Sequence, residues 1–149
     1  GLYSSCKKCK DDARKVEWDR RYLNSEHGFV TERIGSLFKP SACKKRGLWP
    51  TITKEKVWEL YHEHKKKYGP NCIYCNKEWT YTRTIFSRNE GHTKRGKPCY
   101  TNFSIDRFDN SQTYTEKNIV FCCMRCNDEK HNISLKMVER ITELKNEME

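Results

Sequence analysis

Four stretches of the chain repeat apolar side chains at the three- and four-residue spacing of a helix that is buried on one face. The expected helices are one that ends between residues 24 and 28, one over 29–38, one from Thr53 to Tyr68, and one that begins at Ser134. Gly28 is predicted to stop the first helix, and Thr53 is the predicted N-cap of the third. Pro40 and the basic segment 44–47 are predicted to form a loop.

Two short apolar segments in the second half of the chain predict a pair of β-strands. They cover residues 103–108 and 118–122, and the polar residues 109–111 between them are typical of a turn. A helix is expected to begin close to Asn127. The chain therefore predicts an α+β fold around a strand–strand–helix unit, with residues 80–86 as a further candidate strand.

The composition limits the core and favours a polyanionic partner. Only 35% of the 149 residues are hydrophobic and 34% are charged, so the apolar core must be modest and metal crosslinks would matter. The net charge of +10 is typical of a protein that binds nucleic acid, although a soluble protein with solvated charges is the alternative. The phosphate contacts expected in DNA are Lys44, Lys45, Arg46, Lys94, Arg95 and Lys97.

The chain is expected to divide near residue 50. Residues 1–50 would form an N-terminal helical segment with a cysteine knuckle, and residues 51–149 the domain that carries the chemistry. No signal peptide and no apolar run long enough to cross a bilayer is recognised, and nine cysteines are an odd number. These features favour an intracellular, reducing location without membrane contact. The opening Gly-Leu leaves room for a missing upstream segment.

Two Cys-x-x-Cys pairs carry the strongest chemical signal. Cys72 and Cys75 form the first pair, and Cys123 and Cys126 the second, which together offer the four thiolates of a tetrahedral structural zinc site. Cys6 and Cys9 have the same spacing without an evident second pair. We expect a second zinc site there, whose other ligands either preceded Gly1 or are Cys43 and Cys99; free thiols are the alternative.

The residues around these pairs resemble a known family. The matching segments are Ile105-Asp106-Arg107-Phe108-Asp109-Asn110, Tyr114-Thr115, Asn118-Ile119-Val120 and Cys123-x-x-Cys126-Asn127-x-x-Lys130. Over roughly residues 53–135 the chain is similar to HNH endonucleases of the ββα-metal superfamily, in particular the PacI-type restriction endonucleases and related phage proteins. The resemblance implies a zinc-clamped ββα-metal core, cleavage of double-stranded DNA, and a homodimer. It also implies that Asp106 and Asn127 hold a catalytic divalent ion, for which Mg²⁺ suits the oxygen ligands.

One position departs from the commonest pattern of the family. A histidine that acts as general base usually follows the metal-binding aspartate, but here that residue is Arg107, which cannot accept a proton near neutral pH. Arg107 could instead bind a phosphate. The resemblance suggests Tyr74 as a substitute base, with packing over the zinc site as its alternative role, and His27 as another candidate. A degenerate module that binds DNA without cutting it is the competing hypothesis.

Overall fold

The computed structural model describes residues 7–82, 99–130 and 135–149 of the chain. Its elements in chain order are the helices α1 (Lys7–Leu23), α2 (Glu26–Leu37), α3 (Pro40–Arg46) and α4 (Lys54–Tyr68), the strands β1 (Phe103–Arg107) and β2 (Ile119–Cys123), and the helices α5 (Met124–Glu129) and α6 (Leu135–Met148). The mixed α+β class predicted from the sequence is confirmed. The predictions made for Cys6, Lys94, Arg95, Lys97, Ser134 and most of the 80–86 strand lie outside the described residues, as does the Cys9 side chain.

The junction between the first two helices differs from the prediction. The first helix ends at Leu23, and Gly28 lies inside α2 instead of stopping α1. Ser25 begins α2 by accepting a hydrogen bond from the Gly28 backbone amide at 3.1 Å. A Cβ atom on Gly28 would stand 2.0 Å from the carbonyl oxygen of Tyr22. The glycine is therefore required because the end of α1 passes too close to α2 for any side chain.

The predicted loop at residues 40–47 is wrong, because this segment forms the short helix α3. Pro40 occupies the start of the helix, where its missing N–H leaves no hydrogen bond unmade. Gly47 ends the helix in the left-handed region at φ 68°. Both residues are helix-boundary signals, and the basic run Lys44, Lys45 and Arg46 lies in the last turn, where cations complement the helix dipole.

Helix α4 follows its sequence pattern closely. Thr53 caps its first turn, with its hydroxyl accepting a hydrogen bond from the Lys56 amide at 3.2 Å, as predicted. The helix buries Val57, Tyr61 and His64 on one face and ends at Gly69. Its end delivers the chain to the first cysteine pair.

The two strands form an antiparallel hairpin that leads directly into α5. The register pairs Phe103 with Cys123 and Asp106 with Val120. Nearly every residue of both strands is buried, because the helices and the cysteine turn cover both faces. The helix predicted near Asn127 begins three residues earlier, at Met124.

The main hydrophobic cluster joins α2, α4 and the hairpin. Tyr61 is fully buried at its centre, with its ring 5.2 Å from that of Phe103 and 5.7 Å from that of Phe121. Phe29 on α2 belongs to the same cluster, so residues on both sides of position 50 share one core. A second cluster surrounds the cysteines with Val120 and Leu144.

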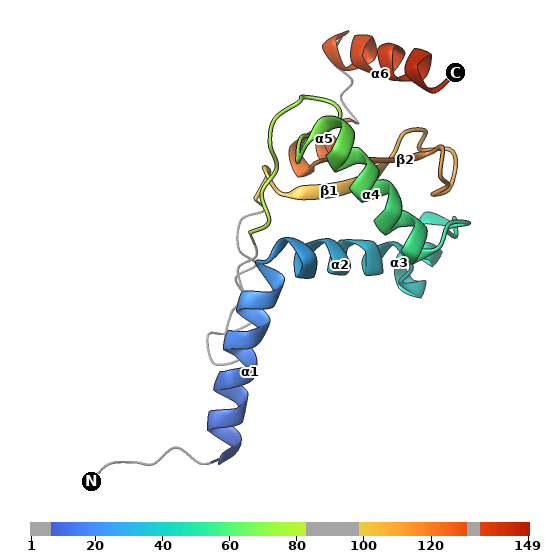
Figure 1. Ribbon diagram of the computed structural model, residues 1–149. Helices are drawn as coiled ribbons and strands as arrows, with labels where there is room; N and C mark the ends of the chain where they lie inside the picture. Colours follow the sequence, from blue (N-terminus) through green and yellow to red (C-terminus); the bar gives the residue numbers. More distant parts are fainter. Residues whose placement is uncertain (1–6, 83–98, 131–134) are drawn as a thin grey trace.

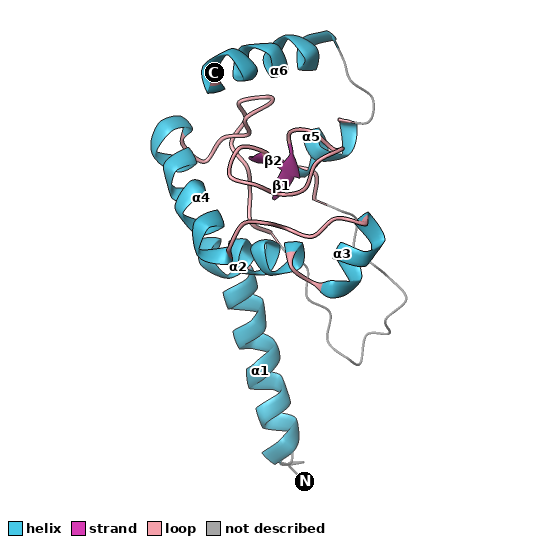
Figure 2. Cartoon of the chain, turned by 90° about the vertical axis from the view of Figure 1, so that its right-hand side faces the viewer, coloured by secondary structure: helices cyan, strands magenta, loops and turns pink. Residues whose placement is uncertain are grey.

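The helices at the two ends of the chain lie at opposite ends of the molecule. Figure 1 shows α1 running away from the body, and α6 on the far side of the hairpin; Figure 2 shows the same arrangement from a second direction. Among the described residues, no helix has the length and apolar character needed to cross a bilayer.

Candidate active site and metal centre

The four cysteines of the two pairs meet at one point. Cys72 and Cys75 lie in the turn after α4, Cys123 ends β2, and Cys126 lies on α5. Their sulfur atoms all lie within 4.8 Å of one another, the only such metal-capable group of His, Cys, Asp or Glu side chains in the described parts of the chain. A tetrahedral zinc with Zn–S bonds of about 2.3 Å separates its sulfurs by about 3.8 Å. The Cys75 and Cys123 sulfurs are 3.9 Å apart, so the group fits zinc.

The electrostatics of this cluster also suit a cation. Hydrogen bonds from Cys126 and Cys72 lower the pKa of the Cys123 thiol to about 2, because they stabilise its thiolate. The hydrogen bonds of Cys126 with Cys123 and Cys72, followed by burial, raise the pKa of the Cys126 thiol, because they favour its protonated form. A bound cation would favour the thiolate form of all four sulfurs.

Backbone geometry shapes the first cysteine turn and attaches it to the sheet. Asn76 takes a left-handed conformation at φ 59°, which asparagine tolerates, and its amide donates to the Cys72 carbonyl at 2.8 Å. The Ile73 amide donates to the Phe121 carbonyl of β2 at 3.1 Å. The cysteine turn is therefore held to the hairpin by hydrogen bonds as well as by the sulfur cluster.

Asp106 lies buried on β1 beside this turn and is only 5% exposed. Its Oδ2 atom accepts a hydrogen bond from the Tyr74 hydroxyl at 2.8 Å and forms an ion pair with the Lys130 ammonium at 2.8 Å. Burial, followed by the charge of Asp106, raises the pKa of Tyr74, so its phenol stays protonated as a hydrogen-bond donor. Lys130 also donates to the Arg107 carbonyl and, at 3.3 Å, to Asn110 Oδ1.

Asn127 reaches the same strand from α5. Its Nδ2 atom donates to Ser104 Oγ at 2.8 Å and contacts the Ile105 carbonyl at 3.4 Å. Ser104 and Asp106 are two apart on β1, so their side chains share one face of the strand. In the described residues, contacts to Asp106 are made at Oδ2 and contacts to Asn127 at Nδ2, which leaves Oδ1 of each side chain as the oxygen that a cation could take.

Two residues of this site carried no predicted role of their own. Lys130 follows Asn127 by three residues and so lies one turn further along the same side of the chain, and Ser104 precedes Asp106 by two. These spacings are the only sequence signal for them. The charge partner of Asp106 and the hydrogen-bond partner of Asn127 become evident only from the folded structure.

The side chain of Arg107 contacts a different group from that of Asp106. Its guanidinium donates to the Gln112 carbonyl at 3.1 Å and lies over the Tyr114 ring at 5.8 Å. The Arg46 guanidinium lies over the same ring at 5.4 Å and donates to the Leu37 carbonyl at 2.7 Å. Arg107 and one of the predicted DNA contacts, Arg46, thus meet at Tyr114, whereas the predicted contacts Lys44 and Lys45 are exposed at the end of α3.

The remaining predicted residues lie elsewhere. The His27 ring stacks on Trp58 at 5.2 Å and lines a surface cavity of about 420 Å³ with Glu26, Trp58 and His62; none of its described contacts reaches Asp106. Cys43 donates to the Leu37 carbonyl, and Cys99 contacts Thr101, so neither belongs to the sulfur cluster. Cys122, which adjoins the cluster residue Cys123, is a buried free thiol.

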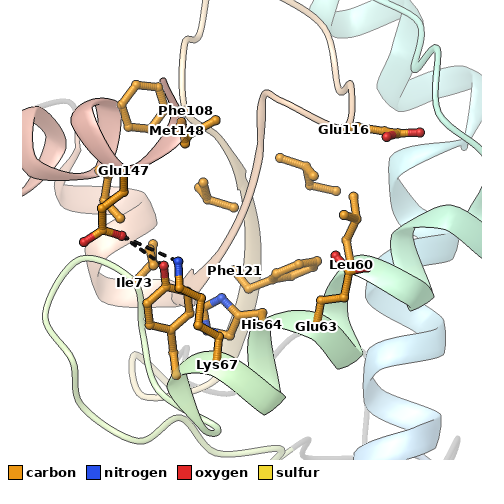
Figure 3. A pocket seen from close by; sticks show the side chains of 14 residues that line it. Leu60, Glu63, His64, Lys67, Ile73, Phe108, Glu116, Phe121, Glu147 and Met148 are labelled. Atoms are coloured by element: carbon orange, nitrogen blue, oxygen red, sulfur yellow. Dashed lines mark hydrogen bonds and ion pairs between the residues drawn. The ribbon is translucent and has the colours of Figure 1, made fainter.

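Two hollows flank the hairpin. One, of about 590 Å³, is lined by Lys130 and Asn110 and so adjoins the Asp106 ion pair; its lining also includes the exposed Lys117 and Lys145 together with Asp109 and Glu149. The other, of about 300 Å³, lies between α4 and α6 and is shown in Figure 3. Its lining is mostly apolar. At its edge Glu147 accepts a hydrogen bond from the Tyr68 hydroxyl and forms an ion pair with Lys67. Asp106 and Asn127 do not line this hollow.

A scan against protein-family models, a search of curated proteins and a search of solved structures each found no match to this chain.

Proposed function

We propose that the protein is a metal-dependent endonuclease of the HNH type that hydrolyses phosphodiester bonds in DNA. The observation that supports the proposal is that two residues of α5 and its C-cap bond to β1 on either side of Asp106. Asn127 donates to Ser104 and Ile105, just before Asp106, and Lys130 donates to Asp106 itself and to Arg107. The sulfur cluster joins the end of β2 to the start of α5 and so fixes this unit.

In the proposed reaction each residue near Asp106 has a defined task. Asp106 and Asn127 would hold a magnesium ion, which polarises the scissile phosphate and stabilises the leaving oxygen. Tyr74 and Lys130 hold the Asp106 carboxylate in one orientation through Oδ2. Ser104 accepts from Asn127 Nδ2 and so holds the side-chain amide in one orientation. Arg107 carries a fixed positive charge on the opposite face of β1, beside Gln112 and Tyr114, and suits a phosphate there.

The charge of the molecule supports DNA as the substrate. The net charge is +10, and the exposed Lys44 and Lys45 in the last turn of α3 would contact a phosphate backbone. Double-stranded DNA cut by a homodimer, one strand by each protomer, is the form of the reaction that the family resemblance implies.

The test is a plasmid-nicking assay with magnesium. We expect the zinc-loaded protein to convert supercoiled plasmid to nicked or linear DNA, and we expect Asp106→Asn and Asn127→Ala to abolish this at a temperature where circular dichroism shows that both variants are folded, because Asp106→Asn also leaves the buried Lys130 without its charge partner. Asp128→Asn is the matched control, because this exposed carboxylate is the neighbour of Asn127 on α5, and it should cut at the parental rate. Equal cutting by the Asp106 and Asn127 variants would contradict the proposal.

A second candidate function is DNA binding without cleavage. It is favoured by two observations: Arg107 stands where a histidine base is common, and Lys130 already neutralises Asp106. Under this alternative, no plasmid would be nicked between about pH 6 and 9, where histidine and metal-bound groups change protonation. Asp106→Asn and Asn127→Ala would then bind duplex DNA as tightly as the parent protein.

A further inference from the structure

A continuous row of five rings links the three helices α1, α2 and α4. The ring row consists of Trp18, Tyr22, His27, Trp58 and His62, and successive centroids are 5.0, 6.3, 5.2 and 5.5 Å apart. Three of its four contacts are stacked, with interplanar angles of 6°, 19° and 25°.

The ring row is open to solvent. Trp18 is 61% exposed, which is unusual for a tryptophan, and His27 and His62 are exposed as well. The cavity of about 420 Å³ is lined by His27, Trp58, His62 and Glu26. Its walls are therefore largely the planar faces and edges of rings. Such a surface suits a flat heterocycle better than an aliphatic chain.

Cations stand at both ends of the ring row. On α1 the residue one turn before Trp18 is Arg14, which forms an exposed ion pair with Asp11 at 2.6 Å, and on α4 the residue one turn after His62 is Lys66. On α1, Arg14, Trp18 and Tyr22 therefore follow one another at four-residue spacing. On α4, Trp58, His62 and Lys66 do the same. Glu26, the acidic residue at the cavity, is paired with Lys65 and bonded to the Tyr61 hydroxyl. Its negative charge is therefore offset beside the cavity.

We propose that the ring row is a stacking platform for unpaired bases of a DNA strand. Rings bind bases through their faces, and flanking cations bind the phosphates, which is how proteins hold single strands without reading their sequence. The bases of a duplex are stacked on one another, whereas an unpaired strand can offer its base faces to an exposed ring such as Trp18. The inference deepens the proposed function by naming the form of DNA that the protein holds.

The experiment measures the affinity for a fluorescent oligothymidylate of about 12 nucleotides by anisotropy, in a zinc-containing buffer without magnesium, so that no cleavage occurs. Trp18→Ala, His27→Ala and His62→Ala should each weaken binding by about 5- to 150-fold. Trp18→Phe should retain most of the affinity, because a stacking face remains. Trp49→Ala is the matched control, because Trp49 is also exposed, at 55%, but lies outside the row.

An abasic oligomer of the same length separates base stacking from phosphate attraction. It should bind the parent protein weakly, and the three alanine variants should not weaken it further. Equal affinity of the parent for the abasic and the thymidylate strands would overturn the proposal. So would a result in which the alanine variants lose as much affinity for a blunt duplex as for the single strand. Loss of plasmid nicking with retained single-strand binding would instead count against the endonuclease proposal alone.

Discussion

Lys130 and Asp106 form a buried ion pair, in which Nζ lies 2.8 Å from Oδ2 and the two side chains are 7% and 8% exposed. Such a pair stabilises a fold little in comparison with two apolar residues, but loss of one partner leaves an uncompensated buried charge. The pair therefore links the candidate metal ligand to the stability of the hairpin and α5.

Replacement of Lys130 alone should be strongly destabilising. We expect Lys130→Met to lower the free energy of unfolding by about 3–5 kcal/mol, because the Asp106 carboxylate would keep only the Tyr74 hydrogen bond. The double variant Asp106→Asn/Lys130→Met should recover part of this loss, since no unpaired charge is left and the side-chain amide oxygen at position 106 still accepts the hydrogen bond from Tyr74. Urea denaturation of all four proteins in zinc gives the coupling energy.

The exposed pair of Lys67 and Glu147 serves as the control for this cycle. The two side chains are 64% and 42% exposed and 3.9 Å apart, so Lys67→Met should change the stability by less than about 1 kcal/mol. An effect of Lys130→Met as small as that of the control would show that water reaches Asp106.

The sulfur cluster should hold one zinc ion that the fold needs. Cys72→Ser removes one of four ligands, and we expect elemental analysis to find one zinc equivalent fewer per chain than in the parent. Since a structural zinc contributes on the order of 10 kcal/mol of apparent folding free energy, the variant should also lose its cooperative unfolding transition. Cys122→Ser is the matched control, because this neighbouring thiol is buried outside the cluster and faces the Ser104 carbonyl. A Cys72→Ser protein that is folded without zinc would contradict the prediction that the fold needs the zinc ion.

Two glycines of α2 should respond to alanine with opposite signs. Gly28→Ala should destabilise the protein by about 1–3 kcal/mol, because the new methyl group would meet the Tyr22 carbonyl at 2.0 Å and force the two helices apart. Gly35→Ala meets no atom within 4 Å and should stabilise by about 0.5–1 kcal/mol through its better helix propensity. Thermal unfolding of both variants gives the two signs, and a stable Gly28→Ala protein would mean that α1 does not pack against α2 in this way.

Local patterns in the sequence account for much of the fold. The cap at Thr53, the apolar face of α4 and the strands at 103–107 and 119–123 depend on neighbouring residues, so they could be predicted. Helix α3 could have been predicted as well, because Pro40 and Gly47 are boundary signals that we interpreted as a turn. The role of Gly28 could not be predicted, since it depends on the approach of Tyr22 in the folded chain.

The candidate site shows the same division. The cysteine spacing identifies all four sulfurs, but the partners of Asp106 come from 32 residues before it and 24 residues after it, and no local pattern connects them. Arg107 follows Asp106 directly in the sequence, yet successive strand residues point to opposite faces. Its side chain consequently meets Gln112 and Tyr114, whereas that of Asp106 meets Tyr74 and Lys130.

His64 should make the stability of the protein depend on pH near neutrality. The ring is only 8% exposed, lies between Trp79 and Phe121, and has Nε2 2.8 Å from the Asn71 carbonyl, to which a neutral ring donates. Burial lowers the pKa of His64 below its ordinary value of 6.5, and the hydrogen bond to Asn71 offsets only part of this effect. Below pH 6.5 the unfolded chain therefore binds a proton that the folded chain does not. The free energy of unfolding should fall as the pH is lowered from 6.5 toward the pKa of the folded state, and the loss should level off below it.

His64→Gln removes this titration while its amide can still donate to Asn71. We expect urea denaturation between about pH 7.5 and 5.5 to show a weaker dependence on pH in the variant than in the parent. Protonation of the cysteine ligands affects both proteins alike and cancels in the comparison, provided that zinc is present in both. His62→Gln is the control, because this exposed histidine lies two residues away on the same helix and should leave the pH dependence unchanged. Identical slopes for the parent and His64→Gln would show that His64 keeps an ordinary pKa in the folded protein.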